Sequence, residues 1–193
     1  RDPAGNLTDT LTVNGAENLS VTKAFYPPTV NPGGLSVLTI TLQNTGAINL
    51  VEVTLDDILP GTTSNGVVVA PVPNESTTCA GGVITFPTSQ TIRMTGGSIP
   101  AQVVGIPGIC TINVDVQGKS TNGATPATHT NTISATNVVA TIQGTPSTMN
   151  AQGSASDNLV VRNISLEVVK GFNPLLVYGG ANSLMSITLR NPN

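Results

Sequence analysis

Short stretches in which apolar and polar residues alternate recur along the chain, and breaks rich in Gly and Pro separate them. A period of two is typical of half-buried β-strands, and no stretch keeps a helical spacing of apolar residues over three turns. We therefore predict strands at 18–25, 36–43, 50–57, 66–72, 82–86, 90–94, 109–116, 128–136 and 156–161. The small, polar residues of 137–155 are either a loop or a weak edge strand.

One pair of predicted strands returns later in the chain. LSVTKAFYPPTVNPGGLSVLTITLQN at 19–44 resembles LEVVKGFNPLLVYGGANSLMSITLRN at 166–191. Lys23 is matched by Lys170, and the Gly pair 33–34 by the pair 179–180. Self-similarity of this length indicates an array of like units.

A second similarity sets the boundaries of the units, because GNLTDTLTV at 5–13 reappears as GSASDNLVV at 153–161. Residues 1–15 are then the C-terminal end of one repeat, 16–161 a complete repeat, and 162–193 the first strands of a third. We expect the sequence to be a window of a longer repetitive polypeptide. Closely spaced short strands further predict an all-β fold, an Ig-like antiparallel β-sandwich with flanking partial repeats.

Composition narrows the classes of function. Charged residues make up 9% of the 193 residues, aromatic residues 3%, and Trp is absent. Seven scattered basic residues cannot form a phosphate-binding stripe, so we expect no nucleic-acid partner. No apolar run reaches the ~18–20 residues of a membrane span. A core this poor in aromatic rings has little stability to spare, which favours covalent cross-links.

Three polar residues fall on the apolar faces of predicted strands: Lys23, Asp57 and Asn131. Each would be costly to bury without a partner. Separate explanations exist, because Lys23 could extend its amine to water, Asn131 could bind backbone groups, and Asp57 could cap the following turn. A shared explanation is an isopeptide bond between Lys23 and Asn131, assisted by Asp57.

The proposed bond has a simple chemistry. Burial favours the neutral, nucleophilic amine of Lys23, and a protonated Asp57 could donate a hydrogen bond to the side-chain carbonyl of Asn131. The amine attacks the amide carbon and ammonia leaves. Folding supplies the proximity of the reacting groups, and the event occurs once per unit.

Two cysteines offer a second cross-link. Cys79 follows a strand break and Cys110 begins a strand, and in an exported protein a disulfide between them is the expected state. We predict no metal site, since no cluster of Cys and His is present, and no cofactor; we expect His129 to be a surface strand residue. Asn-x-Ser/Thr sequons make glycosylation possible at Asn6, Asn18, Asn74 and Asn163.

The ordered motifs SVTKAFYPPTVNPGG, VTLDDILPG, STTCAGG, CTINVDV and HTNTIS resemble the repeat of bacterial surface proteins known as domain of unknown function eleven, in its Cys-containing branch. The resemblance covers 16–161 and implies an Ig-like sandwich used in tandem in adhesins, stalks and surface layers. It also implies a Lys–Asn isopeptide, with Lys23, Asp57 and Asn131 at the matching positions and Lys170 beginning the next unit. The chain departs from the commoner pattern at Gly34 and Leu38.

These features predict a structural repeat of an extracellular surface protein: a stalk, an adhesin or a filament. The partners would be neighbouring repeats of one chain or identical subunits of one fibre. We do not expect an enzyme, because the sequence shows no Ser/His/Asp set, no paired carboxylates and no phosphate loop. The alternative is a binding module whose loops, such as 61–65 and 95–108, recognise a carbohydrate or a protein.

Overall fold

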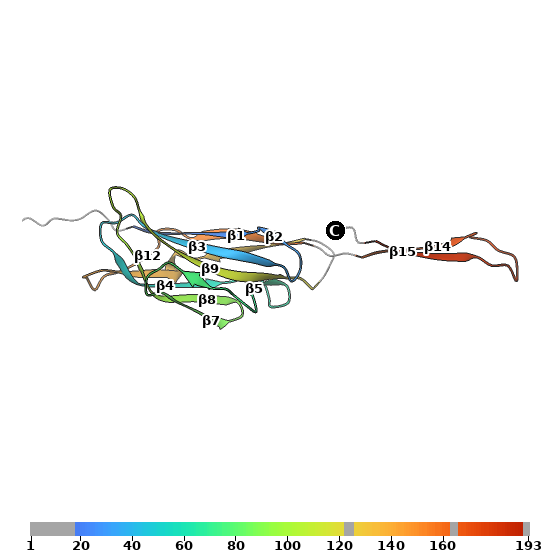
Figure 1. The fold of residues 1–193 in the computed structure, drawn as a ribbon, viewed down its shortest axis with the longest axis horizontal. Helices are drawn as coiled ribbons and strands as arrows, with labels where there is room; N and C mark the ends of the chain where they lie inside the picture. Colours follow the sequence, from blue (N-terminus) through green and yellow to red (C-terminus); the bar gives the residue numbers. More distant parts are fainter. Residues whose placement is uncertain (1–17, 122–125, 163–165, 191–193) are drawn as a thin grey trace, which may run out of the picture.

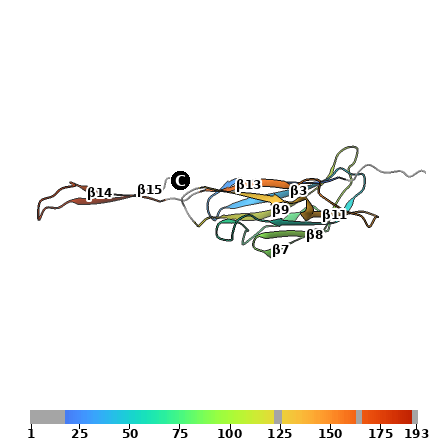
Figure 2. The same ribbon diagram turned by 180° about the vertical axis from the view of Figure 1, so that it is seen from behind.

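The structure is a computed structural model that describes residues 18–121, 126–162 and 166–190. Its strands pack in two layers, as Figures 1 and 2 show from opposite sides. One layer holds a sheet of order β1-β3-β9-β5, and the other a sheet of order β12-β11-β4-β8-β7. A small third sheet, β10-β13-β2, continues the first layer beside β1. The fold is therefore an antiparallel β-sandwich of the Ig-like kind, as predicted.

The strand bounds follow the alternation of the sequence. The first layer contains β1 (Leu19–Tyr26), β3 (Leu35–Asn44), β9 (Gly108–Lys119), β5 (Gly66–Val69) and the short β6 (Ser76–Thr77), which also pairs with β9. The small sheet contains β10 (Ala127–Ile133), β13 (Ala155–Val161) and β2 (Thr29–Val30). The second layer contains β12 (Thr148–Asn150), β11 (Val138–Ile142), β4 (Leu50–Ile58), β8 (Thr91–Ile99) and β7 (Val83–Thr88).

Burial alternates along these strands, so every second side chain enters the space between the layers. The core consists mainly of Leu, Ile and Val side chains, with the ring of Phe25 among them. All of its members lie between Leu19 and Val161. The sandwich thus closes its own hydrophobic core within this range.

All nine predicted strands are present. In the segment 137–155, β12 is the weak edge strand that one of the two predictions described, but the first part of the segment differs from both. Its first part is the strand β11, which pairs with β12 on one side and with β4 on the other. Val138 and Ala140 are fully buried in it. Ala and Thr are weak strand signals in a sequence, and here packing against the opposite layer outweighs that weakness.

Beyond the sandwich, β14 (Glu167–Asn173) and β15 (Leu184–Arg190) form a hairpin that repeats the geometry of β1 and β3. Lys170 pairs with Ile187 as Lys23 pairs with Ile40. The hydroxyl of Ser183 donates to the carbonyl of Pro174 at 2.6 Å, matching the bond from Ser36 to Pro27 at 2.8 Å. The repeat in the sequence is therefore also a repeat in structure.

The turns of the two hairpins correct one detail of the alignment. Gly33 has a φ of +81° and Gly180 a φ of +86°, and each lies one residue before an amide that closes the turn. The conformational match is therefore between Gly33 and Gly180, one position later than the pairing of 33–34 with 179–180 suggests. The requirement for a left-handed residue falls on this glycine of each hairpin.

Candidate cross-linking site

Three polar side chains from three strands meet in the core of the sandwich, and they are the three that alternation predicts to point inward. The Lys23 ammonium of β1 donates to Asp57 Oδ2 of β4 at 2.8 Å. The Asn131 amide of β10 donates to the same oxygen at 3.0 Å. The side chains of Lys23 and Asp57 have no exposed area, and Asn131 is completely buried.

The two layers bring these residues together. Lys23 and Asn131 belong to the layer formed by β1 and the small sheet, whereas Asp57 reaches them from β4 in the opposite layer. Each follows or precedes buried aliphatic residues on the same face of its strand, such as Val21 and Leu55. Because both nitrogens bond to one oxygen, the amine and the amide are within two hydrogen-bond lengths of each other.

The burial of the charged and polar groups makes the unreacted site electrostatically unfavourable. Burial lowers the pKa of Lys23, and the attraction of Asp57 and of Asp157 opposes this effect only in part. Asp57 Oδ1 and Asn131 Oδ1 are buried without a hydrogen-bond partner. A dry ion pair with two unsatisfied oxygens is a poor substitute for hydration, so the unreacted arrangement is energetically unfavourable.

The orientation of the Asn131 amide decides what the site can do. The oxygen and nitrogen of an amide differ little in shape, so the two orientations are distinguished by hydrogen bonding alone. As drawn, Asn131 donates to a carboxylate. With the amide reversed and Asp57 protonated, the acid would donate to the carbonyl oxygen of Asn131, the polarisation that attack by an amine requires.

Asp157 is a fourth polar residue at this site, and the sequence reasoning missed it. Its Oδ2 accepts the backbone N–H of Phe25 at 2.8 Å, which joins β13 to β1 where no strand ladder connects them. The signal was present, because Ala155, Asp157 and Leu159 share one face of β13. A charged residue between two buried ones is the same pattern that identified Lys23.

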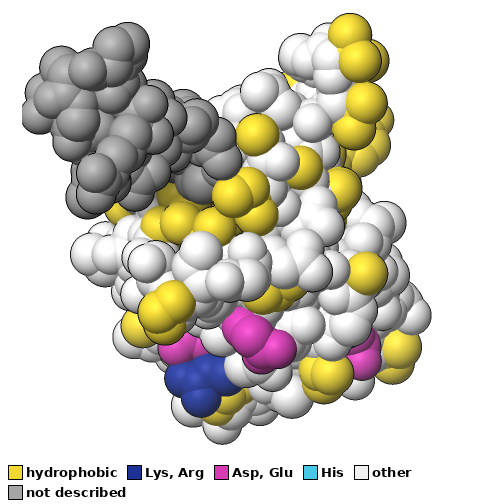
Figure 3. Space-filling view, turned by 90° about the vertical axis from the view of Figure 1, so that its left-hand side faces the viewer, with side chains coloured by type: hydrophobic (Ala, Val, Ile, Leu, Met, Phe, Trp, Pro, Cys, Tyr) yellow, Lys and Arg dark blue, Asp and Glu magenta, His cyan; other side chains and the backbone are white. Residues whose placement is uncertain are grey.

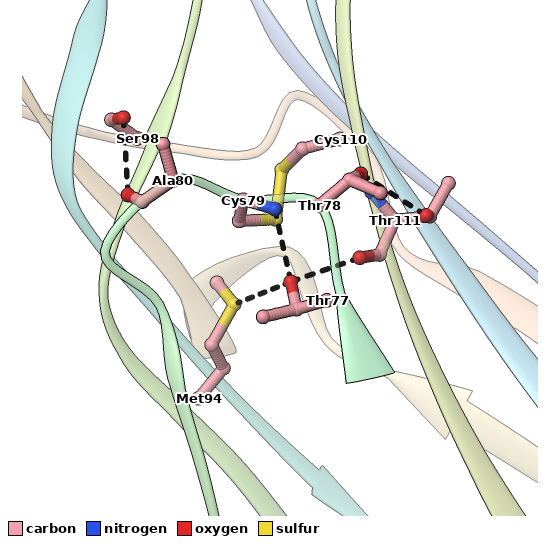
Figure 4. Close-up of a disulfide and its surroundings, with 8 residues drawn as sticks. All are labelled: Thr77, Thr78, Cys79, Ala80, Met94, Ser98, Cys110 and Thr111. Carbon is pink, nitrogen blue, oxygen red and sulfur yellow. Dashed lines mark hydrogen bonds between the residues drawn. A yellow bond between two sulfur atoms is a disulfide. The ribbon is translucent and has the colours of Figure 1, made fainter. Parts of the chain in front are cut away.

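The structure contains a disulfide between Cys79 and Cys110, which lies in the core (Figure 4). Cys79 lies between β6 and β7, and Cys110 belongs to β9, so the bond ties the connection between the layers to the first sheet. Thr77 supports the turn: its hydroxyl donates to the Thr111 carbonyl at 2.9 Å and accepts from the Cys79 amide at 3.0 Å.

The other predicted residues are placed separately. His129 is half-buried on the same face of β10 as Asn131, so it is less exposed than a surface residue, and burial lowers its pKa. Asn18 accepts a hydrogen bond from Gln152, and the exposed Asn74 donates to Asp115 at 2.7 Å. Asn6 and Asn163 lie outside the described residues.

Lys170 is exposed on the hairpin, where its amine lies 5.2 Å from the centre of the Phe172 ring. In the described ranges, no group of three or more His, Cys, Asp and Glu side chains could hold a metal ion. Those same ranges contain no helix of the length and hydropathy needed to cross a membrane.

The two-layer arrangement places the chain in the class of antiparallel, Ig-like β-sandwich domains. Its family is shown by a family model described as a domain of unknown function (DUF7933), which matches residues 20–161. The chain belongs to this family. The match spans nearly the whole predicted repeat, whereas a kinship with domain of unknown function eleven in particular stays a prediction. No curated protein matches the sequence significantly.

Among solved structures, the chain is similar to BcpA, the major pilin subunit of Bacillus cereus, with a TM-score of 0.52 and 11% identity. The similarity covers 98% of this chain and 61% of the pilin, so the chain spans under two thirds of the pilin's length. A cohesin module from Clostridium perfringens is similar at a TM-score of 0.49 and 7% identity, over 76% of this chain and 97% of the module. At these identities the likeness to the pilin concerns the fold alone.

Proposed function

We propose that the chain is a structural repeat of an extracellular fibre, stalk or adhesin, and that each unit is locked by an isopeptide bond between Lys23 and Asn131. The observation that carries the proposal is the burial of Lys23, Asp57 and Asn131 around one shared oxygen. An amine, an acid and a carboxamide in a dry core are the three groups that this bond requires.

The reaction balances within the site. A proton moves from the Lys23 ammonium to Asp57 along their 2.8 Å hydrogen bond, which leaves a neutral amine and a neutral acid. The amine attacks the Asn131 amide carbon while Asp57 donates to the carbonyl oxygen. The attacking nitrogen gives up one proton, which passes to the former amide nitrogen, and this nitrogen departs as ammonia. The product buries no charge, and the Asp57 hydroxyl donates to the oxygen of the new amide, which removes the unsatisfied oxygens of the starting state.

Such a bond forms once and is not turned over, which supports a structural role for the unit. The disulfide supports a location outside the cytoplasm, since disulfides persist in oxidising compartments. The pilin-like fold is consistent with this role, and the repeated hairpin supports assembly from like units. Neighbouring repeats, or identical subunits of the same fibre, would be the partners.

Intact-mass measurement of the chain under non-reducing conditions tests the bond. We expect a mass short of the sequence value by one ammonia and two hydrogens. Lys23→Ala should restore the ammonia and leave the disulfide. Lys119→Ala, at the last residue of β9, should change neither the loss of ammonia nor the loss of two hydrogens. A wild-type mass lacking only two hydrogens would refute the isopeptide.

The equivalence of the two hairpins has its own test, because the hairpin at 166–191 should be able to replace the strands at 19–44 that it resembles. A chain in which 166–191 substitutes for 19–44 should fold and place Lys170 opposite Asp57 and Asn131. We expect its mass to show the same loss of ammonia. A chimera that unfolds, or that retains its ammonia while wild type loses it, would contradict the equivalence of the two segments.

A further inference from the structure

An apolar turn projects from one end of the sandwich, between β8 and β9. Val103, Val104 and Ile106 are 68%, 96% and 72% exposed. Figure 1 shows this loop rising at the end of the molecule where residue 18 enters, and Figure 3 looks onto that end, with hydrophobic side chains along the projection. We call residues 103–106 the apolar tip.

The apolar tip is well ordered by its own hydrogen bonds. Val103 and Ile106 exchange two backbone bonds of 2.9 Å each, and the Gln102 amide anchors the base of the loop to the Gly46 carbonyl at 2.9 Å. Val104 and Gly105 have φ values of +52° and +78°. This is the geometry of a tight hairpin turn with two left-handed residues.

Val104 is an unfavourable residue for its position. A β-branched side chain is rarely found at a positive φ, and Asn or Gly would adopt that conformation with less strain. The side chain is also almost fully exposed, so within the unit it gains nothing from burial. Strain and exposure together point to a contact that lies outside the unit.

The connection between repeats indicates what that contact is. Val13 matches Val161, the last core residue of a unit, and Leu19 is the first core residue of this one. Six residue steps separate them, so the two cores are at most about 22 Å apart along the chain. Val104 lies two extended residues, or about 7 Å, beyond Gln102. The tip therefore reaches across a substantial part of the distance between the two cores.

The opposite end of a unit offers a matching surface. The chain leaves the sandwich there, where the Arg162 amide donates to the Val30 carbonyl. At the same end, Tyr26, Leu35 and Val37 are 78%, 50% and 39% exposed, and Tyr26 pairs with Val37 across β1 and β3. In a row of units, this exit end of one repeat faces the entry end of the next.

We infer that the apolar tip docks on the exit end of the preceding unit and fixes the angle between consecutive repeats. The inference rests on the proposed tandem array, and it assigns the partner as a second domain of the same kind. The contact would make the array a stiff rod, because a connection of five residues (14–18) alone leaves the units free to bend.

A two-unit protein tests the inference: residues 18–161 joined directly to 14–193, so that the native connection follows Val161. Spin labels attached at Thr128→Cys, an exposed position, in each unit report the distance between units. Wild type should give a narrow distance distribution. Replacing the tip with Val103→Ser and Ile106→Ser in the second unit should broaden it at least twofold.

Matched controls distinguish the effect of the apolar tip from the effect of removing exposed apolar side chains elsewhere. Val72→Ser with Val83→Ser changes two exposed valines on the flank of the sandwich and should leave the distribution narrow. Val104→Asn relieves strain at the turn, so it should broaden the distribution without lowering the Tm of a single unit, and it decides the question if the double variant does not fold.

Equal widths in wild type and the tip variants, whether narrow or broad, would overturn the inference. The proposed isopeptide is tested separately in the same samples, because their intact masses report the loss of ammonia whatever the distance between units. If the ammonia is retained but the distance distribution depends on the tip, the isopeptide is refuted and the contact between units is supported. If the ammonia is lost but the distribution does not depend on the tip, the isopeptide is supported and the contact is refuted.

Discussion

Replacing Asp57 with Asn is the most informative single change to the buried site. The substitution keeps the size of the side chain and one acceptor oxygen, and it removes the acid that assists bond formation. If the proposed chemistry is right, Asp57→Asn should retain its ammonia, and Lys23 and Asn131 should remain unlinked. The stability that the variant loses therefore includes the contribution of the bond.

The magnitude follows from the loop that the bond closes. Lys23 and Asn131 are 108 positions apart, and a cross-link over a loop of about 100 residues stabilises by roughly 4.7 kcal/mol in the chain-entropy model. The disulfide already shortens this loop, so we expect a loss of about 4 kcal/mol. For a chain of this size that corresponds to a fall in Tm of roughly 8–16 °C.

The adjacent residue provides the control. Asp56 points out of the sandwich, where both of its oxygens bond to the Arg93 guanidinium at 2.7 Å, and this contact lowers its pKa. Asp56→Asn removes one exposed ion pair, which is worth at most about 1 kcal/mol. It should leave the ammonia deficit intact.

Urea unfolding monitored by circular dichroism, together with the intact mass of each variant, decides the outcome. The reasoning fails if Asp57→Asn still loses ammonia. It fails equally if Asp57→Asn is bond-free but no less stable than Asp56→Asn, since a loop-closing bond must then contribute nothing.

Three further predictions concern the surroundings of the site. Replacing Cys79 and Cys110 together with Ser should lower the unfolding free energy by roughly 3–4 kcal/mol in urea, and a loss below about 1 kcal/mol would contradict the role of the disulfide. Asp157→Ala leaves the Phe25 amide without its partner, so it should cost about 1–3 kcal/mol but keep the ammonia deficit; a full mass would instead make Asp157 part of the reaction. Burial lowers the pKa of His129 below its ordinary 6.5, so the unfolded chain binds a proton that the folded chain resists, and stability should fall as the pH drops below 6.5. His129→Gln should show a weaker fall between pH 7.5 and 5 in the same urea assay, and an unchanged slope would exclude His129 as its source.

The repeat and the alternation of residues were sufficient to predict much of this fold. A period of two assigns faces to a strand without knowledge of its neighbours, which is why Lys23, Asp57 and Asn131 could be identified as inward. The same rule applied to 155–161 would have included Asp157. It was missed because a dispersed acid is usually a surface residue, and only the free amide of Phe25 on the neighbouring β1 gives it a partner.

Other features depended on contacts that alternation does not describe. The strand β11 is held by β4 and β12, and its small residues carry little signal of their own. The exposed strain at Val104 is a property of backbone conformation, which the letters Val-Gly do not specify.

The sequence by itself therefore determined the fold class and the identity of the inward polar residues, because these follow from local periodicity, and the likeness of the two hairpins, because it can be read by comparing the segments. Only the tertiary structure decided that the three side chains share one oxygen, since Lys23, Asp57 and Asn131 come from strands far apart in the chain and from both layers. Periodicity fixes the direction of a side chain, whereas the packing of the layers fixes which side chain it meets.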